Sequence, residues 1–246
     1  SSIQIGATTL ADGAYFTIGS GSANPISLSS ISGTASGSSS NITINTTGAV
    51  TVSGAIGTDI GTLTITNSGG TTFSSTVDVA TVAITSTSLN NAVTFNDSLN
   101  LSSGMTVGAG SAAYNIAING SSNTIAGTTT FANTGTVTLG NGSDTINFTG
   151  GVVATAPSGV TVNGTVTAAG TGVITLGDSG TAVTIGGTSI IGGASTGQIT
   201  TGAINLNNSL TLGAGSATPI TLTTVTGPVS GSANLTINTT GEVTIG

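Results

Sequence analysis

Apolar and polar residues alternate along most of the chain. The alternation is clearest in short triplets that place one Thr or Asn between two apolar residues: VTV at 50–52, LTI at 63–65, VTF at 93–95, VTL at 137–139, INF at 146–148, VTV at 160–162 and VTI at 183–185. A period of two with many β-branched residues is typical of short, half-buried β-strands. Gly, Asn, Ser and Asp lie between the triplets, and no stretch has the spacing of an amphipathic helix. The sequence therefore predicts an all-β protein.

A longer pattern links neighbouring triplets. The template apolar-x-apolar-x-x-x-apolar recurs along the chain: Val50/Val52/Ile56, Val93/Phe95/Leu99, Ile146/Phe148/Val152, Val160/Val162/Val166, Ile204/Leu206/Leu210 and, with Thr in first place, Thr71/Phe73/Val77. The step from Val52 to Phe73 nearly equals the step from Phe73 to Phe95, at about 21–22 residues. The dipeptide Asn-Gly recurs independently at 119–120, 141–142 and 163–164, with the same step.

A period of about 21–22 residues indicates a repeat architecture. It matches one coil of a β-solenoid, whose coils pair in parallel about 4.8 Å apart. We therefore predict a parallel β-helix over residues 1–246, a single continuous unit with coils of about 21–22 residues, or roughly eleven or twelve coils. Val, Ile, Leu and Phe are expected to stack inward, and Asn-Gly is expected to supply the positive φ of tight corners.

A third level of repetition groups the coils. GSGSANPISLSSISG at 19–33 matches GAGSATPITLTTVTG at 213–227, and NITINTTGAVTVSG at 41–54 returns as NLTINTTGEVTIG at 234–246. These offsets predict a super-repeat of about 193 residues, of which the chain holds little more than one. In the second pair, we expect Ile42, Ile44, Val50 and Val52 to point inward around a Thr-Thr-Gly corner. Glu242, which replaces Ala49, is expected to face solvent. The chain is read either as a segment of a longer array or as a polymerising subunit.

Composition excludes several classes of function. Charged residues make up 3% of the chain, against roughly 25% in typical soluble domains. Lys, Arg, His, Cys and Trp are absent, and seven acids give a net charge of -7: Asp12, Asp59, Asp78, Asp97, Asp144, Asp178 and Glu242. Without cations the chain cannot neutralise phosphates, so we expect no nucleic-acid partner. Without His or Cys it has no zinc site, thiolate or imidazole base. No apolar run reaches the length of about 18 residues that membrane insertion requires.

Two candidate sites are better explained by structural or surface roles. GNGSDTI at 140–146 resembles one calcium-binding nonapeptide in which Asp144 would hold the ion, but Leu139 stands where the first Gly belongs. Its nearest relative, NGSSNTI at 119–125, has Asn123 in the place of the Asp, and a structural corner is the better interpretation. Stacking could bring Asp78 near Asp97, slightly less than one period further on, but such acids are more often solvated surface charges. We expect no catalytic, metal-binding or cofactor-binding residues, and no enzyme.

Surface recognition is the remaining alternative. Outward Thr arrays such as VTVNGTVT at 160–167 could form an ice-binding face, which needs a regular lattice, and Tyr15 and Tyr114 are the tyrosines available to a glycan. Asn-x-Ser/Thr sequons are frequent, as expected in a chain rich in these residues, and they include Asn41, Asn45, Asn96, Asn119, Asn141, Asn163, Asn234 and Asn238.

The stretch GAVTVSGAIGTDIGTLTITNSGGTTFSSTVDVATVAITSTSLNNAVTFNDSLNL, at 48–101, resembles the tandem β-repeats of very large bacterial surface proteins. These include filamentous-haemagglutinin-like adhesins and autotransporter-type passengers, and GTLTITNSGGTTF at 61–73 is similar to their recurring step. The resemblance implies a right-handed parallel β-helix, an extracellular or cell-surface location and a role in adhesion or envelope structure. We therefore expect a structural rod: an adhesin stalk, surface filament or sheath component.

Its expected partners are copies of itself or adjacent repeats, stacked end to end, and surface glycans. The alternatives are a glycan- or ice-binding β-solenoid face, or a subunit that polymerises into an extracellular filament.

Overall fold

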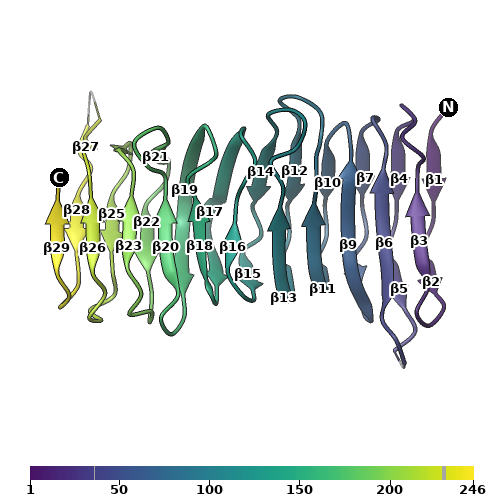
Figure 1. Ribbon diagram of the computed structural model, residues 1–246, viewed down its shortest axis with the longest axis horizontal. Coiled ribbons are helices and arrows are strands. Elements are labelled where there is room, and N and C mark those ends of the chain that lie inside the picture. The colour runs from purple at the N-terminus through teal and green to yellow at the C-terminus, as the bar shows by residue number, and fades with distance from the viewer. Residues whose placement is uncertain (36, 229–230) are drawn as a thin grey trace.

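The computed structural model describes residues 1–35, 37–228 and 231–246. In this part of the chain the regular secondary structure consists of 29 β-strands and no helix. The strands pair in parallel and stack coil on coil, which confirms the predicted β-solenoid. The coils follow one another along the long axis, with the N-terminus at one end and the C-terminus at the other (Figure 1).

Each coil contributes a strand to each of three ladders. The first ladder contains, in order, β1 (Ile3–Ile5), β4 (Ile26–Leu28), β7 (Val50–Val52), β10 (Thr71–Phe73), β12 (Ala92–Phe95), β14 (Asn115–Ile118), the first part of β17 (Thr136–Phe148), the first part of β19 (Gly159–Ala168), β21 (Ala182–Ile185), β24 (Ile204–Leu206) and β27 (Val225–Thr226).

The second ladder follows the first in every coil. It contains β2 (Thr8–Leu10), β5 (Ile31–Gly33), β8 (Ile56–Gly57), the first part of β11 (Val77–Ile84), the first part of β13 (Leu99–Val107), β15 (Ser122–Ile125), the last parts of β17 and β19, β22 (Ser189–Gly192), β25 (Leu210–Leu212) and β28 (Leu235–Ile237).

The third ladder completes the coil. It contains β3 (Tyr15–Ile18), β6 (Ser40–Asn45), β9 (Ile60–Asn67), the last parts of β11 and β13, β16 (Thr129–Thr130), β18 (Gly151–Ala154), β20 (Val173–Leu176), β23 (Ile199–Thr201), β26 (Ile220–Leu222) and β29 (Val243–Ile245). A single bridge between Val107 and Phe131 joins β13 to the segment that follows β16. Strands that run through a corner without a break join the ladders to one another, so that hydrogen bonding connects 23 strands in one sheet and six in another.

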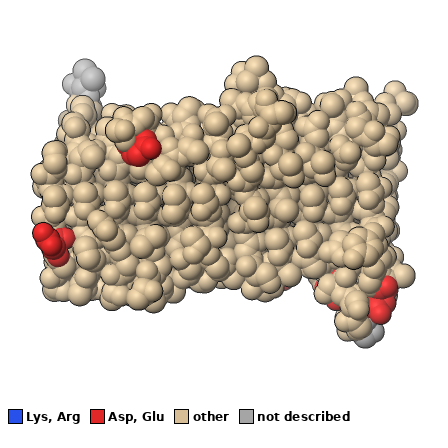
Figure 2. All heavy atoms as spheres, viewed as in Figure 1, with Lys and Arg blue, Asp and Glu red and all other residues tan. Residues whose placement is uncertain are grey.

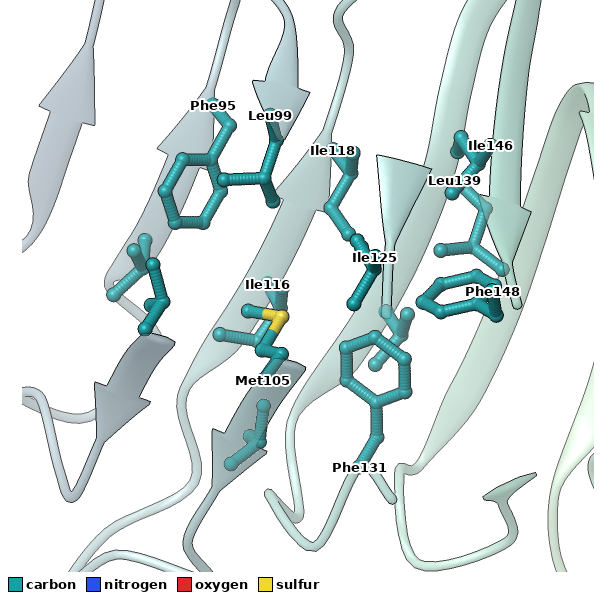
Figure 3. Packing of buried hydrophobic residues seen from close by; sticks show 14 of the residues in the cluster. Phe95, Leu99, Met105, Ile116, Ile118, Ile125, Phe131, Leu139, Ile146 and Phe148 are labelled. Atoms are coloured by element: carbon teal, nitrogen blue, oxygen red, sulfur yellow. The ribbon is translucent and has the colours of Figure 1, made fainter. Parts of the chain in front are cut away.

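The core is one column of apolar side chains that runs through the stack. In β19 burial alternates strictly from Gly159 to Ala168, which places Val160, Val162 and Val166 inside. Figure 3 shows how Leu, Ile, Met and Phe side chains from successive coils pack on one another in the middle of the molecule. Phe73 and Phe95 stack with ring centroids 4.9 Å apart and an interplanar angle of 4°. Like residues therefore lie on like residues, as the alternation predicts.

The coil length varies more than the sequence period suggests. The sequence separation of paired residues is 21 at Val50↔Thr71 and 22 at Thr71↔Val93. It falls to 19 at Thr62↔Thr81 and rises to 26 at Tyr15↔Asn41. The extra residues lie in corners and loops, while the ladders keep their register. Each ladder still contains eleven strands, in agreement with the eleven or twelve coils predicted.

The apolar template marks corners, but not always the same corner. In Val50/Val52/Ile56 the first two residues lie in the first ladder and the third lies in the second ladder. Ile146/Phe148/Val152 instead crosses from the second ladder to the third. The two corners accept the same pattern because each joins two inward-facing strand ends over a similar short distance.

The Asn-Gly dipeptides occupy one corner in three successive coils, between the first and second ladders. The predicted reason for glycine is right only at Gly164, which has φ of +144°. A Cβ on Gly120 would instead collide with the carbonyl of Asp97, and a Cβ on Gly142 would meet nothing within 4 Å. Three glycines at one corner thus have three different local environments.

Candidate functional site

The acidic residues do not gather into a site. On the face that Figure 2 shows, the visible acidic side chains lie at separate places on an otherwise uncharged surface. Within residues 1–35, 37–228 and 231–246, no group of three or more His, Cys, Asp or Glu side chains could hold a metal ion. Several acids instead cap backbone turns. Asp12 accepts the N–H of Ser38 at 2.6 Å, and Asp178 accepts the N–H groups of Gly180 and Thr181 at 2.8 and 2.9 Å.

Asp144, the candidate calcium ligand of the sequence, closes a backbone turn. It lies at the corner inside β17 and is 8% exposed. Its Oδ2 atom accepts the N–H of Asn141 at 2.7 Å, which closes the Asn-Gly-Ser turn. Gly164 of the next coil pairs with Asp144, and a Cβ on Gly164 would collide with the Asp144 carbonyl.

Asn123 does not occupy the place of an aspartate, contrary to the sequence alignment. The register sets it opposite Ile146, so its side chain faces the core and is 1% exposed. Its Oδ1 atom accepts the N–H of Leu99 at 3.0 Å. Its Nδ2 group donates to the carbonyls of Gly120 at 2.6 Å and Thr145 at 3.1 Å. One buried amide therefore links three successive coils, a role that the sequence did not reveal.

The structure does not stack Asp78 on Asp97. Asp78 pairs with Asn100, and Asp97 precedes that strand and accepts the N–H of Ser98 at 2.7 Å. Asp78 lines the same surface hollow as Asp59, with a volume of about 360 Å³. Asp59 and Asp97 are equally far from Asp78 along the sequence, so the spacing alone pointed to the wrong neighbour.

The outer side of the first ladder is a row of small residues that are polar at every position except Ala117. The position between the two inward residues of each strand pairs with the same position one coil away: Ser27, Thr51, Thr72, Thr94, Ala117, Thr138, Thr161, Thr184, Asn205 and Thr226. Coil length varies along the chain, but this row keeps its register because the corners absorb the added residues.

Only one of the two tyrosines is exposed and could contact a bound glycan. Tyr15 is 85% exposed, whereas Tyr114 is buried and its hydroxyl donates to the carbonyl of Gly108 at 2.6 Å. Burial raises the pKa of Tyr114 to about 12. Among the eight sequons named above, the exposed asparagines are Asn96, Asn141, Asn234 and Asn238.

The two ends of the stack differ from its middle because each lacks one neighbouring coil. At the C-terminal end, Ile237, Val243 and Ile245 are 36%, 39% and 65% exposed. At the N-terminal end, Ile3 and Ile5 are half-buried against the core. The unpaired strand edges at these ends offer free backbone groups to another strand.

The described residues contain no helix long and apolar enough to cross a membrane. Comparison with protein-family models, with curated proteins and with solved structures finds no match to this chain.

Proposed function

We propose that this chain is a structural, non-catalytic rod of the bacterial cell surface or extracellular space, serving in an adhesin stalk, a surface filament or a sheath. The observation that carries the proposal is the nested repeat: each coil repeats its neighbours, and one apolar column joins them from β2 to β26. A rod of this kind needs partners only at its ends, where adjacent repeats or copies of the chain would stack.

Stiffness and resistance to proteolysis follow from this arrangement. Each inner coil is held on both sides by backbone hydrogen bonds in three ladders, so local opening of one coil breaks bonds to two others. The stability of such arrays is approximately the sum of coil and interface terms. Because the chain has no Lys or Arg, enzymes of the trypsin type have no cleavage site in it even when it is unfolded.

The test is digestion with proteinase K, which needs no basic residue. Folded protein should remain full-length under conditions that degrade the heat-unfolded chain within minutes, and electron microscopy should show short straight particles. Equal rates of digestion for the folded and unfolded chain would contradict the proposal. Its location is tested separately, by antibody labelling of intact and lysed producing cells; labelling only after lysis would contradict a surface role.

A second candidate function rests on the polar row of the first ladder. Hydroxyls repeated at the coil spacing of about 4.8 Å would match an ordered surface such as ice or a crystalline polysaccharide. Thr94 and Thr138 lie on this row, and Thr200 lies on the third ladder as a matched control. Thr94→Lys or Thr138→Lys should abolish inhibition of ice recrystallisation, or binding to insoluble chitin or cellulose, while Thr200→Lys should not. No activity of the parent chain in these assays would dismiss this candidate.

A further inference from the structure

The last coils repeat coils near the N-terminus in conformation as well as in sequence. The Thr46 hydroxyl donates to the carbonyls of Ser22 and Asn24 at 2.6 and 3.0 Å. It also accepts the N–H of Gly48 at 3.0 Å. The second copy makes the same three bonds at 2.9, 2.5 and 2.9 Å, between Thr239 and its partners Ser216, Thr218 and Gly241. The corner therefore keeps its conformation where it recurs together with the repeated residues of the preceding coil.

The two copies lie on different faces of the solenoid. β6 and β7 belong to the third and first ladders, whereas the equivalent β28 and β29 belong to the second and third. The strand equivalent to β4 is β26. Along the first ladder, β24 lies eight coils after β4, and the chain then passes through β25 in the second ladder before it reaches β26 in the third. The super-repeat is thus two-thirds of a coil longer than a whole number of coils.

The first copy shows what covers these residues. Ile44, Val50 and Val52 are 0%, 2% and 0% exposed, because β9 and β10 of the next coil lie on them. Their equivalents Ile237, Val243 and Ile245 are the exposed residues of the C-terminal edge. Asn41 also accepts the N–H of Thr62 from the covering coil at 2.9 Å, and Asn234 offers the same amide at the edge.

From this equivalence we infer that the C-terminal edge is a docking surface for one kind of partner: a further coil with the sequence pattern of residues 54–79, rotated by one face. Such a coil brings Leu63 and Ile65 over the second ladder and Phe73 over the third. The inference deepens the proposed function, on which it rests, because it selects adjacent repeats over plain copies as the partner at this end.

Two glycines of the covering coil explain why the edge would accept that coil and reject the N-terminal coil of a second copy. Gly69 lies against the Thr-Thr-Gly corner so closely that a Cβ would approach the Thr47 carbonyl to 2.5 Å, and Gly70 has φ of +102°. If the N-terminal coil of a second copy stacked on this edge, β3 would take the place of β10. Phe16 and Ile18, which face inward in β3, would then replace Thr71 and Phe73, and Ala14 and Tyr15 would replace the two glycines. Head-to-tail stacking would therefore force an Ala Cβ into the corner formed by residues 238–241.

The test extends the whole chain after Gly246. One extension adds a second copy of residues 54–107, which continues the super-repeat, and a control of equal length adds residues 1–54, which imitates head-to-tail stacking. Hydrogen exchange of the peptide 234–246 is followed by mass spectrometry. We expect the first extension to slow this exchange by about tenfold or more, and the control to leave it near the parent value. Gly69→Ala within the added copy should return most of the exchange.

Each outcome decides the inference. Equal protection by both extensions, protection by neither, or end-to-end filaments of the parent chain with residues 234–246 protected would overturn it. Failure of the rod itself is recognised separately, because the amides of Val160 and Val162 in the parent chain would then exchange rapidly. If those amides remain protected while the 54–107 extension has no effect, the docking rule is wrong and the rod stands.

Discussion

The buried amide of Asn123 offers the sharpest test of how the coils are held together. Its side chain replaces a backbone partner for the Leu99 N–H on one side and reaches the Thr145 carbonyl on the other. Asn123→Ala removes both of these bonds and the bond to Gly120 without changing the exposed surface. The substitution therefore probes the contact between coils separately from the corner chemistry.

The expected cost can be worked out from these three bonds. Leaving a buried N–H such as that of Leu99 without a partner costs about 1–3 kcal/mol, and the two carbonyls that lose a donor add to this cost. The sum is about 3 kcal/mol in the free energy of unfolding. Asn123→Asp keeps the oxygen that accepts the Leu99 N–H, but it places a carboxyl group against the two carbonyls that the amide bonded. Burial would raise the pKa of this carboxyl group. Its stability should therefore be highest at acid pH and fall as the pH rises above about 4.

Urea unfolding, followed by circular dichroism, measures these costs. Asn100→Ala is the matched control, because Asn100 lies on the neighbouring strand with its side chain on the outer surface. Hydrogen exchange should locate the loss to the coils that contain Leu99 and Thr145. If Asn123→Ala is as stable as Asn100→Ala, the amide does not hold the coils together and the reasoning is wrong.

Three further perturbations test the core, a corner and a buried phenol. Phe95→Ala should lower the free energy of unfolding by about 3–5 kcal/mol, because it leaves a cavity under Phe73, whereas Thr94→Ala on the outer face of the same strand should cost less than about 0.5 kcal/mol; equal costs in urea unfolding would refute the stacked core. Gly164→Ala should destabilise by about 1–3 kcal/mol through its positive φ and the Asp144 carbonyl, while Gly142→Ala, with open space around it, should be nearly neutral; the thermal midpoints of the pair decide this. Because burial raises the pKa of Tyr114 from 10.0 to about 12, its protonated form is favoured by folding, so stability should fall as the pH rises from 10 towards 12. Tyr114→Phe should flatten this slope, and an unchanged slope in urea titrations at pH 9 and 11 would contradict the assignment.

The fold could be predicted from the sequence because its two strongest signals are local. Alternation in triplets such as 160–162 identifies strands, and burial in β19 follows it residue by residue. Repetition at a period of about 21–22 residues identifies coils, since parallel ladders place like residues on like. Both signals survive irregular coils because loops lie outside the ladders.

The details of candidate sites could not be predicted, because they depend on register between coils. Asp78 is equally far in sequence from Asp59 and from Asp97, and only the length of each intervening corner decides which pair shares a hollow. Asn123 likewise aligns with Asp144 by sequence, but the ladder pairs it with Ile146, because the corner inside β17 is longer than the corner before β15. Asn123 therefore lies within a strand over the core, whereas Asp144 lies at the turn. The length of a corner sets the register of the strand that follows it, and no apolar pattern records that length.

The face on which a motif appears is set by the number of strands that precede it, whereas its conformation recurs with the repeated sequence of the motif and of the preceding coil. The corner around Thr46 and the corner around Thr239 have the same three hydrogen bonds, although they lie at different corners of the solenoid. This independence is possible because neighbouring coils supply equivalent carbonyls at each corner. In an array built from this super-repeat, successive copies of a surface motif would therefore turn by one face each and return to the first face after three copies.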